Sequence, residues 1–333
     1  MSRRSAVNSE IRSFFSKHGF IEADTPALTP SVIPEAPIEL FKTSFRTPYS
    51  AGRDMYLLPS PEYYLKQLIA GGSGDIFSLS KSYRNSEQTG EHHNPEFTML
   101  EYYKMDADCT DSIDLTEDMI DNLLCSLDSS VLSVDAPGKL APPFNRISMD
   151  RLFDQILSFD LSRHCSGELS AEEERAELAA LAADSGLSAS ESDSWEMLFN
   201  LVFVHEIEPR IASGKPTVIT DYPSGIPALA LPAEQKGRLE RWELYAGGIE
   251  LANCYSEERD YDRIRRFFDA EAEEKKHSMI RVDTDYGWPE IFRNGFPRCS
   301  GTAVGVDRLI MLLSGASSVE GVILFPFSDI ISG

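Results

Sequence analysis

The stretch SLSKSYRNSEQTGEHHNPEFTMLEYYK, residues 78–104, decides the fold. Apolar and small polar residues over 76–83 predict a strand, a polar loop follows, and residues 97–105 predict a second strand, so the stretch is typical of a long antiparallel hairpin. The first strand delivers Arg84 to the mouth of the loop, where a guanidinium offers a planar fork of donors suited to a phosphate. Alternation along the second strand places Glu101 and Tyr103 on one face.

Composition narrows the class of protein. Among 333 residues, 54 acidic side chains outnumber 31 basic ones, for a net charge of −23. Because a protein that binds the RNA backbone needs a basic footprint, this acidity disfavours tRNA as a partner; it suits either a basic protein partner or simple solubility. No apolar run approaches the ~20 residues of a membrane-spanning helix. The five scattered cysteines, without a CxxC, favour reduced thiols in a cytoplasmic protein.

Two further elements precede the hairpin. Apolar residues at helical spacing predict an amphipathic helix over 4–17. The run GFIEADTPAL, residues 19–28, predicts a strand that ends at a proline, and further strands are expected over 38–45 and 54–58. Ser60-Pro61-Glu62 then starts a helix, with serine as the cap, proline in the first position and an acid in the first turn.

The chain after the hairpin changes character. A helix is expected over 109–127, and residues 128–216 are rich in short helices, including one over 171–187, which indicates a helical insertion. His164 and Cys165 are adjacent there but lack the further ligands of a metal site. A strand is expected over 217–222.

Two later runs carry chemistry. In WELYAGGIELAN, residues 242–253, Glu243 and Glu250 flank two glycines; two carboxylates suit Mg²⁺ shared with phosphates, or are unrelated surface acids. After a charged helix over 257–277, the run CSGTAVGVDR, residues 299–308, predicts strand, turn and helix. Gly305 lets a nucleotide approach the backbone, and Arg308 in the first helical turn can reach a phosphate.

Taken in order, residues 19–28, 78–104 and 299–308 resemble the three signature motifs of class II aminoacyl-tRNA synthetases, in their lysine-type version. The resemblance implies an α+β fold, with an antiparallel sheet flanked by helices and a helical insertion. It also implies a homodimer through the first motif.

The catalytic core of lysyl-tRNA synthetase is similar to most of the chain. Because the first motif begins near residue 20, we expect a single catalytic domain over 1–333 and no anticodon-binding domain. A stand-alone core resembles the elongation factor P–(R)-β-lysine ligase family, which uses ATP to join β-lysine to a lysine of elongation factor P. Ala303 supports this branch, since lysyl-tRNA synthetases typically have glycine there, and one methyl shifts selectivity by ~1–3 kcal/mol.

The resemblance also implies roles for individual residues. Those expected to hold the diamino acid are Ser60, Pro61, Glu62, Tyr103, Glu250 and Ala303. Those expected to hold ATP are Arg84, Asn85, Glu87, Asn94, Glu243, Leu244, Gly305 and Arg308, with Arg84 and Arg308 as catalytic groups and Glu243 and Glu250 as Mg²⁺ ligands. The loop departs from the family pattern, because Ser86 stands where a glutamate is usual and the loop is one residue longer.

Three alternatives stay open at this point: acylation of tRNA by a truncated synthetase, release of a free adenylate, and a non-catalytic interaction module. Intact Arg84, Glu243, Glu250 and Arg308 disfavour the last. The sequence does not distinguish β-lysine from α-lysine, and it does not identify the docking surface of the acceptor.

Overall fold

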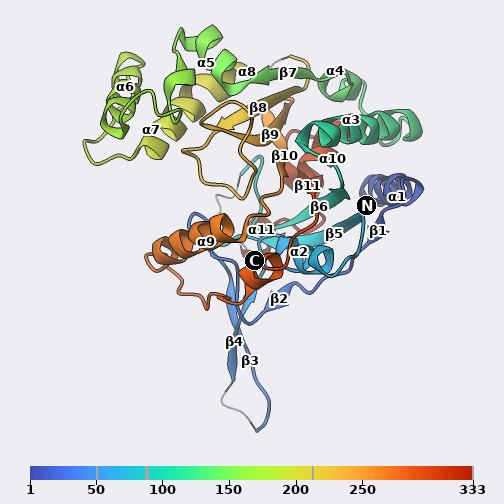
Figure 1. The fold of residues 1–333 in the computed structure, drawn as a ribbon. Coiled ribbons are helices and arrows are strands. Elements are labelled where there is room, and N and C mark those ends of the chain that lie inside the picture. Colours follow the sequence, from blue (N-terminus) through green and yellow to red (C-terminus); the bar gives the residue numbers. More distant parts are fainter. Residues whose placement is uncertain (50–51, 87–89, 212–213, 332–333) are drawn as a thin grey trace.

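The structure is a computed structural model that describes residues 1–49, 52–86, 90–211 and 214–331. Its centre is an eight-stranded sheet in the order β1-β5-β6-β11-β10-β9-β8-β7 (Figure 1). The strands are β1 Ile21–Glu22, β5 Ile76–Tyr83, β6 Glu96–Met105, β7 Asn145–Ser148, β8 Thr217–Pro223, β9 Arg238–Ala246, β10 Ile249–Ser256 and β11 Cys299–Gly305.

The predicted antiparallel sheet is confirmed from β5 to β8, whereas β1 and β7 pair in parallel at the two edges. The predicted hairpin is also confirmed, with Ile76 opposite Tyr103 and Tyr83 opposite Glu96. Tyr102 points to the opposite face from its neighbours, where its hydroxyl lies 2.7 Å from Thr116 of α3.

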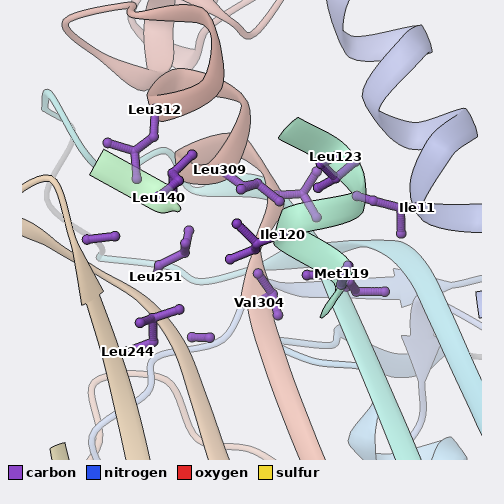
Figure 2. Packing of buried hydrophobic residues seen from close by; sticks show 14 of the residues in the cluster. Ile11, Met119, Ile120, Leu123, Leu140, Leu244, Leu251, Val304, Leu309 and Leu312 are labelled. Carbon is purple, nitrogen blue, oxygen red and sulfur yellow. The ribbon is translucent and has the colours of Figure 1, made fainter. Parts of the chain in front are cut away.

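Helices cover most of one face of the sheet. They are α1 Ser2–Lys17, α3 Cys109–Ser126, α4 Ala136–Leu140 and α10 Val306–Ser314. A capping box between Asp108 and Asp111 starts α3. Figure 2 shows this core, in which Met119, Ile120 and Leu123 of α3 and Leu309 and Leu312 of α10 pack above Leu244, Leu251 and Val304 of the sheet. Each such side chain contributes about 1.5–3 kcal/mol on burial.

The other face is covered at its two sides only. The apolar cluster beside β5 involves α2 Glu62–Ala70, α9 Tyr261–Lys275 and η3 Trp288–Phe292. The cluster over β8 and β9 involves α5 Met149–Leu157, η1 Leu161–Arg163, α6 Ala171–Asp184, α7 Trp195–Val202, η2 Phe203–Ile207 and α8 Glu208–Ile211. The strands between these clusters, β11 and β10, are left to line a cleft.

Several sequence-based boundaries are wrong. The single strand expected over 19–28 is two short ones, β1 and β2 Leu28–Thr29, because Pro26 has no N–H to continue a ladder. β2 instead joins β4 Arg53–Leu57 and β3 Lys42–Phe45 in a small sheet, of which β3 and β4 project from the body (Figure 1). The strand expected over 38–45 is shorter, because β3 begins only at Lys42.

The insertion is not purely helical, because β7 within it extends the main sheet by pairing with β8. The helices expected over 171–187 and 257–277 are α6 and α9, both shorter than expected. At the end of the chain, η4 Val319–Gly321 and α11 Phe327–Ile331 follow α10. Within the part of the chain that the structure describes, none of the helices is long and apolar enough to cross a membrane.

Candidate active site

Cross-strand register brings the cleft residues into rows. One row runs Ser78, Glu101, Ala303, Asn253, Glu243 across five strands, and the adjacent row runs Ile76, Tyr103, Gly301, Tyr255, Arg241. Because side chains alternate along each strand, both rows lie on the face that the helices leave open. Residues up to 202 positions apart in the sequence thus become neighbours, as the paired residues Glu101 and Ala303 illustrate.

A cleft of about 370 Å³ lies over this open face. Its lining includes six of the residues singled out from the sequence, namely Arg84, Asn94, Glu250, Ala303, Gly305 and Arg308. Ser60, Pro61 and Glu62 lie in separate, adjoining cavities at the start of α2.

Arg84 presents free donors to the cleft. Its guanidinium lies 5.3 Å from the centroid of the Phe97 ring, which supports the group from one side. Its Nε is buried and has no hydrogen-bond partner among the residues that the structure describes. A buried donor without a partner is costly, so an anionic ligand would find this group already oriented.

Arg308 is engaged with the protein. Its Nη1 donates to the carbonyl of Glu250 at 2.7 Å and its Nε donates to the carbonyl of His92 at 3.2 Å, while Nη2 lies 2.8 Å from Nε2 of His93. The hairpin loop therefore packs against Arg308, and a nucleotide phosphate would replace these contacts.

The two candidate Mg²⁺ ligands differ in their surroundings. Glu243 receives hydrogen bonds from Arg241 at 2.6 Å and from the hydroxyl of Tyr245 at 3.1 Å. Arg241 is itself stacked between the rings of Tyr222 and Tyr255. Glu250 is only partly buried, with its side chain 40% exposed. Partial burial, followed by the charge of Glu243, raises the pKa of Glu250 to about 7, against the opposing effect of Arg308.

Glu101 links two expected substrate residues. Its carboxylate accepts hydrogen bonds from Ser60 Oγ at 2.9 Å and from the Tyr103 hydroxyl at 2.7 Å, and the residue is 4% exposed. Ser60 Oγ also accepts from the backbone N–H of Glu62 at 2.9 Å, so the serine fixes the start of α2. Burial and the nearby Glu62 raise the pKa of Glu101 to about 8.

A buried lysine lies between two further carboxylates. Nζ of Lys66 is 2.5 Å from Glu62 and 2.7 Å from Glu257. Burial alone would lower the pKa of Lys66, but Glu257 and Glu62 more than offset it, so the lysine stays charged. Burial and Glu62 raise the pKa of Glu257 to about 7 despite Lys66.

Gly301 is required by this packing. A Cβ added there would lie 2.3 Å from Glu257 Oε1 and 2.5 Å from the Tyr103 ring. In contrast, a Cβ at Gly305 would meet only the Arg308 side chain at an ordinary 3.6 Å. Close packing within the protein therefore requires a glycine at position 301, whereas it does not require one at position 305.

Other expected site residues are placed differently. Leu244 is fully buried under the helices, so any contact that it makes with ATP would come from its backbone. Asn85 donates to the carbonyl of Leu40, and Asn94 bonds both the carbonyl of Glu96 and the N–H of Phe327. Their amides are thus occupied by the protein. Glu87 lies outside the described residues.

Sequence reasoning missed Asn253, Glu257 and Lys66, and it named Glu101 without giving it a role. Period-two alternation continues from Asn253 through Tyr255 to Glu257, and this signal was available in the sequence. Nothing in the sequence indicated that Lys66, on a helix otherwise expected to bury apolar residues, would point into the site.

Comparisons with known proteins give a consistent set of relatives. The family described as tRNA synthetases class II (D, K and N) matches residues 1–329. A protein of Yersinia enterocolitica named elongation factor P–(R)-β-lysine ligase is 35% identical, over 97% of this chain and 94% of its own length. Proteins of the same name from Salmonella paratyphi B and Salmonella schwarzengrund are 34% identical, over 97% of this chain and 93% of their own length.

Proposed function

The chain belongs to the class II tRNA synthetase family (D, K and N), among the elongation factor P–(R)-β-lysine ligases, and we propose that it activates (R)-β-lysine with ATP and joins it to a lysine side chain of elongation factor P. The observation within the chain that carries this proposal is a pocket rich in carboxylates near Arg84, whose buried Nε has no hydrogen-bond partner among the described residues.

The charge of that pocket fits a diamino acid. Glu62, Glu101 and Glu257 surround one cation, Lys66, so the ionised pocket carries two uncompensated negative charges. The raised pKa values of Glu101 and Glu257 follow from burial and from this mutual repulsion. Two ammonium groups would neutralise the pocket, while the substrate carboxylate would face Arg84.

The proposed chemistry has two steps. A carboxylate oxygen attacks the α-phosphorus of ATP, the bond from that phosphorus to the bridging oxygen breaks, and pyrophosphate leaves. The neutral ε-amine of the acceptor lysine then attacks the acyl carbon of the adenylate; the carbon–oxygen bond breaks, AMP leaves, and the nitrogen loses a proton as the amide forms. Arg84 and Arg308 would stabilise the phosphate charges, and the pocket would fix the carboxylate in line.

The residues Glu243 and Glu250 fit a role as Mg²⁺ ligands. Mg²⁺ is commonly held by one or two carboxylates together with substrate phosphates, and burial beside Glu243 raises the pKa of Glu250. No group of three or more His, Cys, Asp or Glu that could hold a metal by itself occurs in the described residues. The ion would supply neutralisation of phosphate charge, and Arg241 orients Glu243 from behind.

A homodimer is part of this proposal. The first motif exposes apolar side chains, with Ile21 62% and Leu28 43% exposed, which supports burial of these strands against a second copy. Sedimentation at micromolar concentration should give a dimer, and a clean monomer would reject it.

The proposal is tested with labelled (R)-β-lysine, ATP, and either elongation factor P or lysine tRNA as acceptor. Label should pass to elongation factor P and not to tRNA. An elongation factor P whose acceptor lysine is replaced by arginine is the matched control and should stay unlabelled. Transfer to tRNA alone would favour a truncated synthetase instead.

A further inference from the structure

The connector between β2 and β3 is fixed in place above the start of α2. On one side the N–H of Ala36 donates to Glu271 of α9 at 2.8 Å. On the other side the carbonyl of Glu39 accepts from the N–H of Asn85, next to the phosphate-binding arginine, also at 2.8 Å. Glu35 directly precedes Ala36, and its carbonyl accepts from the N–H of Ile38 at 3.2 Å, so the attachment to α9 and this turn fix its backbone position.

Glu35 borders a small cavity together with Ser60, Glu62 and Tyr63. The cavity measures about 10 Å³, which is close to the space that one water molecule needs and therefore suits a single ammonium-sized group. Ser60 and Glu62 are residues of the proposed diamino acid site, so this cavity is an extension of that site.

Glu35 is half-buried, and its carboxyl has no hydrogen-bond or ion-pair partner in the part of the chain that the structure describes. Partial burial, with a further contribution from Glu62, raises its pKa to about 7, although Arg84 and Lys275 oppose the shift. The ionised carboxyl is therefore repelled by Glu62, and a cation that enters the cavity would relieve this repulsion.

We infer that Glu35 is a specificity-determining residue that binds the ammonium group nearer to the reacting carboxyl of the diamino acid. This inference rests on the proposed function. Arg84 is one of the charged neighbours of Glu35, and the connector bonds to Asn85 beside that arginine, so Glu35 lies toward the phosphate end of the site. Glu257 is more deeply buried, at 3% exposure, and pairs with Lys66, so it serves the distal ammonium.

A carboxyl on a fixed loop would sense where along the substrate that amine lies. Moving the amine by one carbon, as between β-lysine and α-lysine, changes its distance to Glu35 without changing the distal amine. Glu35 would therefore act together with Ala303, which lies on the floor of the cleft, to select the amine position.

The test is Glu35→Gln, which keeps the shape of the side chain and removes its charge. In ATP–pyrophosphate exchange, kcat/KM for (R)-β-lysine should fall roughly 10- to 100-fold, as expected for loss of a charged hydrogen bond. The competitive inhibition constant of 6-aminohexanoic acid, which lacks the nearer amine and keeps the distal one, should not change. Glu35→Asp should restore part of the lost activity. The melting temperature should stay the same or rise, because the substitution removes an unpaired acid that Glu62 repels.

Glu274→Gln is the matched control, since it removes the same charge from an exposed position on the neighbouring helix. An unchanged kcat/KM in Glu35→Gln would overturn the inference. So would equal weakening of β-lysine activation and of 6-aminohexanoic acid binding together with a lower melting temperature. An unmodified protein without β-lysine-dependent exchange would instead reject the proposed function, and the inference with it.

Discussion

Arg84 and Arg308 line the same cleft, but their hydrogen bonds differ. Arg84 has a buried donor without a partner, whereas Arg308 bonds to the Glu250 carbonyl and to the hairpin loop. An arginine with an unsatisfied donor can bind a phosphate without breaking another hydrogen bond. An arginine that must first give up its protein partners gains less free energy from the same phosphate. At the scale of single residues, we therefore assign the greater share of phosphate stabilisation to Arg84.

Replacing Arg84 by alanine should lower kcat/KM in β-lysine-dependent exchange by at least ~10², about 2.7 kcal/mol of transition-state stabilisation. Arg84→Lys keeps the charge without the planar fork. Its kcat/KM should therefore lie between those of the unmodified protein and of Arg84→Ala. Exchange kinetics on the three proteins measure this. Near-normal exchange in Arg84→Ala would show that this residue is not the phosphate ligand.

Ala303 lies in the cleft row between Glu101 and Asn253 and lines the cleft. Ala303→Gly should improve α-lysine relative to β-lysine by roughly tenfold, which corresponds to ~1.4 kcal/mol. Exchange with each isomer measures the ratio. If the methyl only packs the sheet, stability would fall by ~0.5–1 kcal/mol and the ratio would not move.

At the scale of elements, the hairpin, α1, α3, β8 and the strand–helix unit at the third motif were predictable, because each has a strong apolar period in the sequence. The edge strands were not. β1 and β7 are short and depend on the neighbour that they pair with, and β7 lies in a segment whose composition indicates helices. The site was only partly predictable, since Lys66 and Glu257 meet only through contacts between a helix and a strand that are distant in the sequence.

The attachment of the insertion to the sheet gives an element-scale prediction. Arg238 of β9 is 1% exposed and donates to Asp150 of α5 and to the carbonyls of Leu161 and His164. Arg238→Ala leaves these acceptors without their donor and should lower the free energy of unfolding by about 3–5 kcal/mol. Urea unfolding measures it.

The control is Arg151→Ala, at an exposed position on α5 next to Asp150. It should change the free energy of unfolding by less than about 0.5 kcal/mol. Equal stabilities for the two variants would show that the buried arginine does not join the insertion to the sheet.

At the scale of the whole molecule, the glutamates with raised pKa values make the stability of the fold depend on pH. Burial raises the pKa of Glu101 to about 8 and those of Glu35, Glu250 and Glu257 to about 7, while an unfolded glutamate titrates near 4.3. Between these values the folded protein holds more protons than the unfolded chain. Its stability should therefore decrease as pH rises from about 4.5 to about 8.

A diamino acid should reverse this trend, because its ammonium groups pair with carboxylates that are ionised at higher pH. The increase in melting temperature caused by (R)-β-lysine should be greater at about pH 8 than at about pH 6. Glu101→Gln removes the group with the highest of these pKa values and should flatten the upper part of the profile. A protein that becomes more stable from about pH 6 to about pH 8 without ligand would contradict the account.

The central claim is that this chain joins a lysine-like amino acid to a protein. The most direct measurement is mass spectrometry of elongation factor P after incubation with the chain, ATP and (R)-β-lysine. The account predicts a mass increase of one β-lysyl group on a lysine side chain, dependent on ATP and abolished by Arg84→Ala. Unmodified elongation factor P, under conditions in which β-lysine-dependent pyrophosphate exchange proceeds, would contradict it.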